Sequence, residues 1–162
     1  MLVFVLGTTA CGGASFAGGV YRGHGVAYEV SPLGEGWRSV DVGDHNDLAW
    51  RNDALSSIVQ INSTCEADMD VPLQALTNHL LIGFTEREIQ SQELQPLDGR
   101  ESLVTSLSAK LDGVPRSLLL VVMKKDGCVY DMALISADAA AFDSARPAFD
   151  SLRGSFHTVD VP

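Results

Sequence analysis

Two Asp-Gly pairs constrain this chain more than any other feature. They are Asp112-Gly113 and Asp126-Gly127, and they separate three runs of strand-like residues within residues 99–136. Asp-Gly between apolar runs is the strongest short-range hairpin signal, because a type I′ turn needs positive φ at both central residues. The stretch therefore predicts a three-stranded antiparallel meander. It contains no recognisable catalytic motif.

The residue pattern places the strands of this meander in a sheet. Ser102–Leu111 alternates apolar and polar residues, as a half-buried strand does. Leu118–Met123 is continuously apolar, which favours a central strand covered on both faces. The third strand begins at Cys128. Thr85–Pro96 precedes the meander and is predicted as an edge strand, since proline is tolerated there.

The first half of the chain contains further strand patterns. Val26–Ser31 and Trp37–Val42 flank a glycine-containing loop and are predicted to form a hairpin. Shorter runs at Leu48–Arg51 and Ser57–Asn62 are predicted as two more strands. These strands, together with the meander, indicate a predominantly antiparallel sheet.

Two helices complete the prediction. The first is expected to begin at Asp70 as N-cap, with Pro72 in its first turn and Gly83 at its end. The second has apolar residues at helical spacing, but Pro147 interrupts it. We therefore expect a short turn at 139–143 and a separate helix from 144 to 153. The fold class predicted is α+β with an antiparallel sheet.

The order of these elements resembles a known fold. The supporting residues are a Pro…Gly-Trp loop (Pro32, Gly36, Trp37), Cys128-Val129-Tyr130 after the last turn, and a terminal Ser155-Phe156. Over Val26 to Phe156, the chain resembles the PsbP-like α/β/α sandwich found in photosystem subunits, a Ran-binding import factor and DcrB-type envelope lipoproteins. The resemblance implies a non-enzymatic binding or assembly module. It carries over no catalytic residue.

The N-terminus resembles a bacterial lipoprotein signal with its lipobox. A short apolar run at Leu2–Leu6 is followed by small residues and Cys11, and residues 11–24 are rich in glycine. By this resemblance, cleavage falls between Ala10 and Cys11, and Cys11 carries the lipid. We expect a signal segment at 1–10, a flexible tether at 11–24 and a single PsbP-like domain at 25–157.

An ordinary first strand with Cys11 as a plain thiol is the alternative. Thr8 stands where lipoboxes usually have leucine, and the leader carries no basic residue. The glycine-rich tether nevertheless favours the lipoprotein interpretation, because such a chain suits a flexible linker better than a docked strand. The expected location is the periplasmic side of the cell envelope, at the outer membrane. The expected partners are the membrane and an envelope protein.

Cys65 and Cys128 are the cysteines that remain if Cys11 is lipidated. Two cysteines suffice for one disulfide in an oxidising compartment, and export would place them there. Two buried free thiols, which behave as small hydrophobic groups, are the alternative. The sequence favours the disulfide.

Charge and loop composition limit the functions that the chain can serve. The net charge of −10 argues against nucleic-acid binding, which needs clustered Lys and Arg. Asp41, Asp44 and Asp47 share a loop with His45 and are weak candidates for Ca²⁺ binding, since the spacing differs from that of an EF-hand. A solvated acidic loop is the simpler interpretation. We expect no metal and no cofactor.

Asp131 is the one polar residue of the meander without an evident role. It shares the parity of Val129 and Ala133, which places it on an apolar face. Burial of a carboxylate requires a partner or a raised pKa. Arg116 and Arg100 are the basic residues that could form an ion pair with Asp131. A functional acid is the other possibility.

Three functions remain open from the sequence. The favoured one is a non-enzymatic, lipid-anchored envelope protein that acts as a binding or assembly module. The second is a hydrolase-type enzyme that uses Asp131 or the Asp44/His45 loop and needs a pocket with convergent polar groups. The third is a calcium-dependent binding module.

Overall fold

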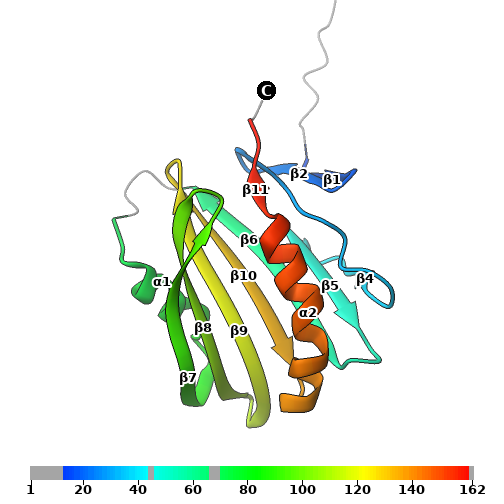
Figure 1. The fold of residues 1–162 in the computed structure, drawn as a ribbon, viewed down its shortest axis with the longest axis vertical. Coiled ribbons are helices and arrows are strands. Elements are labelled where there is room, and N and C mark those ends of the chain that lie inside the picture. Colours follow the sequence, from blue (N-terminus) through cyan, green and yellow to red (C-terminus); the bar gives the residue numbers. More distant parts are fainter. Residues whose placement is uncertain (1–12, 44–45, 66–69, 161–162) are drawn as a thin grey trace, which may run out of the picture.

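The computed structural model describes residues 13–43, 46–65 and 70–160, which form two antiparallel sheets and two helices (Figure 1). The helices are α1 (Leu73–Leu80) and α2 (Ala139–Ser155). The larger sheet has the strand order β4 (Arg38–Ser39), β5 (Leu48–Asn52), β6 (Ser57–Cys65), β10 (Cys128–Ser136), β9 (Val114–Lys125), β8 (Arg100–Leu111), β7 (Phe84–Leu97). The smaller sheet has the order β1 (Ser15–Ala17), β2 (Val20–Gly23), β3 (Val26–Glu29), β11 (His157–Thr158). The predicted α+β class is therefore confirmed.

The predicted meander forms the centre of the larger sheet. Both turns have positive φ at their two central residues, 50° at Asp112 and 77° at Gly113 in the first, and 52° and 77° at Asp126 and Gly127 in the second. A third turn, at Asp98-Gly99, has the same geometry and joins β7 to β8. The meander consequently has four strands, and β7 is its edge strand, as Pro96 indicated.

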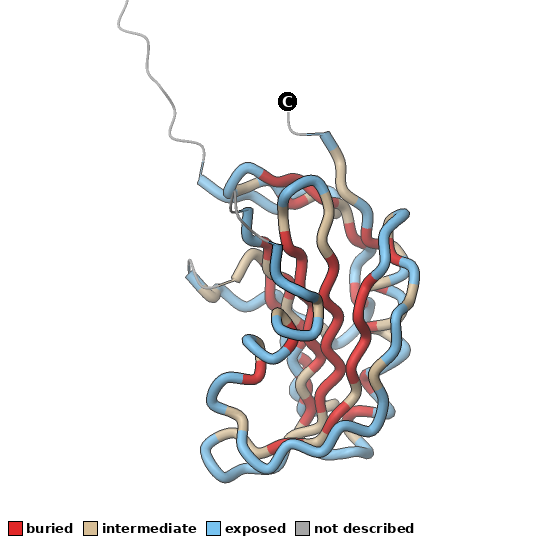
Figure 2. The backbone as a smooth tube through the Cα atoms, turned by 90° about the vertical axis from the view of Figure 1, so that its left-hand side faces the viewer, coloured by how far each residue is buried: buried red, intermediate tan, exposed pale blue. Residues whose placement is uncertain are grey.

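The two faces of the larger sheet are covered unequally. On one face, α2 and the smaller sheet pack against central residues such as Ile61, Val121 and Met132. On the other face, α1 covers a smaller apolar cluster that includes Leu107 and Leu118. Figure 2 views the molecule from the α1 side and shows the buried central strands beside the largely exposed α1 segment. Eight residues of helix are too few to cover this face of the sheet.

Two predictions for the N-terminal half were wrong. Residues 13–24, expected to belong to a flexible tether, contain β1 and β2, and Tyr21 is only 1% exposed. Tyr21 is buried because its ring stacks on that of Tyr28, with centroids 5.0 Å apart. The hairpin expected between the next two strands is also absent from the described residues. Instead, β3 pairs with β2 and β11, and β4 pairs with β5 in the other sheet.

Both helices begin or continue differently from the prediction. Pro72, rather than Asp70, is the N-cap of α1, and it provides no side-chain hydrogen bond. Helix α2 is continuous through Pro147 and is capped by Asp138, whose side chain accepts a 2.9 Å hydrogen bond from the Ala141 amide. Pro147 and Asp143 are both exposed, so water can satisfy the carbonyl that proline leaves without a donor. The apolar stripe of α2 therefore continues without a break.

Asp98 connects the meander to the smaller sheet. Its carboxylate accepts hydrogen bonds from Lys125 Nζ at 2.7 Å and from the Thr158 amide and hydroxyl, both at 2.8 Å. Burial acts to raise the pKa of Asp98, but these hydrogen bonds and the Lys125 charge outweigh it, and the pKa is lowered. The charged form is therefore the one that stabilises the fold.

We expect Asp98→Asn to lower the free energy of unfolding by about 2 kcal/mol at neutral pH, because charged hydrogen bonds are lost while asparagine keeps the positive-φ turn. The difference from wild type should shrink as the pH falls below 3.8, the ordinary pKa of Asp, and through the lowered pKa of Asp98 in the folded protein. Urea unfolding at several pH values measures this. Asp112→Asn, in an equivalent turn, is the control; an equal loss there would contradict the role of Asp98.

Candidate functional site

A groove between α1 and the larger sheet is the candidate site, and it encloses about 530 Å³. We call it the α1 groove. Its sheet side is formed by Asn62 and Thr64 of β6, Val122 of β9, and Val129 and Asp131 of β10. Its helix side is formed by Val71, Ala75, Leu76, His79 and Leu80. The groove exists because α1 is short and leaves this part of the sheet uncovered.

Asp131 lies on the floor of the α1 groove. In the sheet it stands opposite Asn62 of β6 and Val122 of β9. The residue is 7% exposed, which confirms the burial inferred from its parity. Asn62 Nδ2 donates a 3.3 Å hydrogen bond to Asp131 Oδ2. Among the described residues, this is the single hydrogen bond of the carboxyl group, and the group has no ion-pair partner.

Burial raises the pKa of Asp131 to about 6, an effect that the hydrogen bond from Asn62 opposes and the charge of Asp47 reinforces. The basic partners considered from the sequence do not pair with it. Arg116 Nη1 instead donates to the Pro115 carbonyl oxygen at 2.9 Å. Arg100 stands opposite Leu97 where β7 and β8 meet, and does not contact the carboxylate. At neutral pH the fold therefore holds a buried, unneutralised charge.

The surroundings of Asp131 are mostly apolar. Val122 and Val129 lie beside it on the sheet and are fully or almost fully buried, while Leu76 and Leu80 are partly buried on the helix. His79 also lines the groove but makes no ion pair with Asp131. Lys124 donates a 2.8 Å hydrogen bond to the carbonyl oxygen of Val71 at the rim. The groove thus combines an aliphatic lining with one buried carboxylate.

The predicted disulfide is present beside this groove. Cys65 and Cys128 stand opposite each other at the ends of β6 and β10, with Cα atoms 4.1 Å apart and a bond between their sulfur atoms. Their neighbours Thr64 and Val129 line the groove. The disulfide therefore fixes the two strands that form one end of the site.

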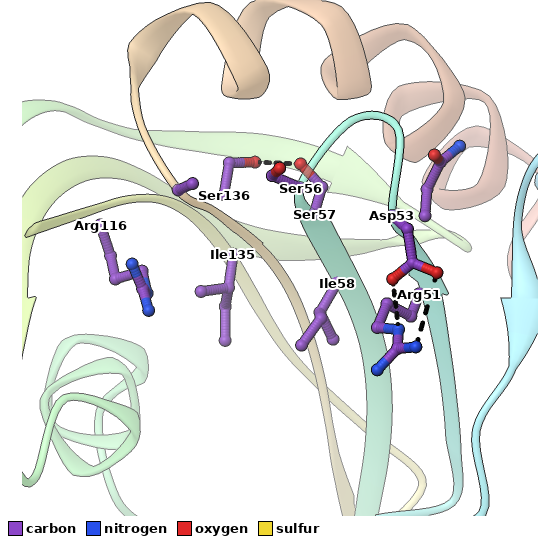
Figure 3. Close-up of a pocket in the computed structure, with 10 residues that line it drawn as sticks. Arg51, Asp53, Ser56, Ser57, Ile58, Arg116, Ile135 and Ser136 are labelled. Atoms are coloured by element: carbon purple, nitrogen blue, oxygen red, sulfur yellow. Dashed lines mark hydrogen bonds and ion pairs between the residues drawn. The ribbon is translucent and has the colours of Figure 1, made fainter. Parts of the chain in front are cut away.

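A second, smaller hollow of about 290 Å³ lies at the other end of the sheet (Figure 3). Several of its polar groups are already paired. Asp53 forms ion pairs with Arg51 and Arg38. The hydroxyls of Ser57 and Ser136 lie 2.8 Å apart and share a hydrogen bond. Because these groups satisfy one another, this hollow is a weaker candidate than the α1 groove.

The acidic loop does not assemble as a site in the described residues. Asp44 and His45 lie outside them. Asp41 Oδ1 accepts a hydrogen bond from the Gly43 amide at 2.9 Å. Asp47 faces the core, where it accepts hydrogen bonds from Ser63 at 2.5 Å and Tyr28 at 3.2 Å. Burial raises the pKa of Asp47, and the described residues contain no cluster of three or more potential metal ligands.

The comparisons with known proteins identify the fold. No protein-family model and no curated protein matches the sequence. The structure is similar to the cyanobacterial PsbP, CyanoP, of Synechocystis, with a TM-score of 0.58 and 21% identity over 82% of this chain and 86% of that one. The fold is therefore PsbP-like, as the sequence resemblance indicated.

Two other solved structures share this fold. LpqN of Mycobacterium tuberculosis, described as involved in cell envelope biogenesis, has a TM-score of 0.54 and 12% identity over 85% of this chain and 88% of that one. The Ran-binding protein Mog1p of Saccharomyces cerevisiae has a TM-score of 0.53 and 12% identity over 84% of this chain and 91% of that one. At these identities, the similarity establishes the fold.

The sequence indicated part of this site. It identified Asp131 and both cysteines, but it did not indicate the helix side of the groove, which includes Leu76 and Leu80. The helix-side lining could have been suspected from the short distance between Pro72 and Gly83, which limits the helix to about three turns. No helix in the described part of the chain is long and apolar enough to cross a membrane.

Proposed function

We propose that this protein is a non-enzymatic binding protein of the bacterial cell envelope, anchored by lipid on Cys11, and that the α1 groove is its binding site. The observation that supports this most strongly is the buried Asp131 carboxylate, which has one neutral hydrogen-bond partner in an open groove. Such a charge destabilises the folded protein, and perturbed groups of this kind concentrate at functional sites.

Binding is favoured over hydrolysis by the groups that surround Asp131. Nucleophilic catalysis needs a nucleophile within hydrogen-bond reach of a base. Thr64 carries the single hydroxyl among the described residues that line the groove, these residues include no serine or cysteine, and no hydrogen bond joins Thr64 or His79 to Asp131. The groove therefore offers a charge and an apolar surface, which suit recognition of a ligand.

The proposed location in the envelope has two independent supports. The Cys65–Cys128 disulfide suits an oxidising compartment. The solved structure of LpqN, a protein involved in cell envelope biogenesis, has the same fold. The lipid on Cys11 is proposed from the sequence, because residues 1–12 lie outside the described part of the chain.

Mass spectrometry of the protein purified from host membranes tests this proposal. We expect the native wild-type protein to retain a non-covalent ligand. Ala75→Trp should abolish the retention, because residue 75 is exposed and lines the groove. Gln74→Trp is the matched control, since Gln74 is an exposed neighbour outside the lining.

The same preparation also tests the anchor. We expect an acyl-modified Cys11 at the start of the mature chain. An intact, unmodified Met1–Cys11 segment would contradict lipid anchoring. A ligand retained equally by wild type and Ala75→Trp would contradict the α1 groove as the binding site.

A further inference from the structure

We propose that the α1 groove binds a small amphipathic cation, whose ammonium group contacts Asp131 and whose aliphatic body packs between α1 and β10. This inference rests on the proposed function, and it specifies the chemical class of the ligand. Three features support it: the unused hydrogen-bond capacity of Asp131, the aliphatic lining, and the depth of the carboxylate below the surface.

The carboxylate of Asp131 can accept more hydrogen bonds than it has. Oδ2 accepts from Asn62, and Oδ1 has no partner among the described residues. It is also the one carboxylate among the described residues that line the groove. An ammonium group carries three donors and a full positive charge, so it would satisfy the free oxygen and neutralise the buried charge. A neutral alcohol could donate a hydrogen bond to the free oxygen but could not neutralise the charge, and the carboxylate would repel an anion.

The aliphatic lining determines the rest of the ligand. Val122 and Val129 on the sheet face Leu76 and Leu80 on the helix across the groove. An inorganic cation or a bare ammonium ion would leave the partly buried Leu76 and Leu80 in contact with water. An alkyl body would bury them together with its own surface. The volume of about 530 Å³ lies within the range of small-molecule sites.

The depth of Asp131 favours a small molecule over a folded partner. Asp131 as a whole is 7% exposed, so a flat protein surface cannot reach its carboxylate. Among the described residues, the other charged or titratable groups near Asp131 are His79 on α1, Lys124 at the rim, and Asp47, whose charge acts on the Asp131 carboxyl group. His79 is exposed, and Lys124 donates to the Val71 carbonyl. Neither forms an ion pair with Asp131, so the carboxylate is available to a ligand cation.

Calorimetric titration with three six-carbon probes tests the inference: hexylammonium, hexanol and hexanoate. At about pH 8, both the ammonium group and Asp131 are charged. We expect wild type to bind hexylammonium at least about tenfold more tightly than hexanol, a difference that a charge-assisted hydrogen bond would produce. Hexanoate should bind least.

Two variants isolate the role of the carboxylate. Asp131→Asn should lose the preference for hexylammonium. Asp112→Asn, which makes the same change in net charge in an exposed turn, should keep it. Equal affinity of Asp131→Asn and wild type for hexylammonium would overturn the inference, as would tighter binding of hexanoate. Binding of a lysine-containing peptide, but not of hexylammonium, would overturn the commitment to a small ligand.

Recognition of charge and binding in the α1 groove can fail separately. If hexanol and hexylammonium bind wild type equally and Ala75→Trp blocks both, the groove remains a binding site and the recognition of charge is refuted. If Ala75→Trp blocks neither probe, both proposals fail. If wild type prefers hexylammonium to hexanol and Ala75→Trp binds neither probe, the result supports both proposals.

Discussion

Replacing Cys65 and Cys128 by alanine should lower the free energy of unfolding by about 4 kcal/mol. The disulfide joins residues 63 apart in the sequence. In the chain-entropy model, closing a loop of this length lowers the conformational entropy of the unfolded chain, and this loss corresponds to about 4 kcal/mol of stability. Because the two cysteines stand opposite each other on neighbouring strands, reduction also removes a direct link between β6 and β10.

Guanidinium unfolding of the oxidised protein, the reduced protein and the double variant measures this effect. The reduced protein and the double variant should be destabilised by similar amounts. Both should also bind probes of the α1 groove more weakly, since Thr64 and Val129 adjoin the two cysteines. An unchanged unfolding midpoint in the double variant would contradict this role for the disulfide.

Replacing Asp131 by asparagine should have the opposite effect and stabilise the protein by about 3 kcal/mol at pH 8. Burial raises the pKa of Asp131 from 3.8 to about 6 in the folded protein, and this difference gives the free energy by which folding disfavours the charged form. Asparagine keeps a similar shape and one oxygen that can accept the hydrogen bond from Asn62, and it removes the buried charge.

The pH dependence of this stabilisation is specific. Because the folded-state pKa is raised, the folded protein binds more protons than the unfolded chain between pH 3.8 and about 6. The loss of stability that the charged Asp131 causes in wild type is complete above about pH 6, and it disappears as the pH falls from there toward 3.8. The advantage of Asp131→Asn should therefore vanish by about pH 4, as thermal or urea unfolding can measure. Lower stability of Asp131→Asn than of wild type at pH 8 would show that the charge is compensated.

The sequence was most informative where local chemistry determines structure. The Asp-Gly turns at 112–113 and 126–127 need positive φ, which few residue pairs provide, so they predicted the hairpins directly. Asp98-Gly99 carries the same signal and could have extended the meander to four strands. The parity of Asp131 depended only on strand alternation, and the structure confirms it.

Prediction failed where distant contacts decide the structure. The glycine-rich composition of 11–24 indicated a tether, but Tyr21 in this stretch is buried against Tyr28. Pro147 indicated a helix break, yet its exposed position allows α2 to continue. The α1 groove could not be predicted from local residue patterns, because it arises where a short helix packs on a wide sheet. Such a mismatch is a property of tertiary packing.

The most direct test is a carbon-detected NMR titration of the Asp131 carboxyl group, with and without saturating hexylammonium. We expect a midpoint near pH 6 in the free protein. With hexylammonium bound, the midpoint should move to lower pH, because a bound cation favours the charged carboxylate. A midpoint near the ordinary value of 3.8 in the free protein, or one that hexylammonium leaves unchanged, would contradict a buried carboxylate that recognises a cation in the α1 groove.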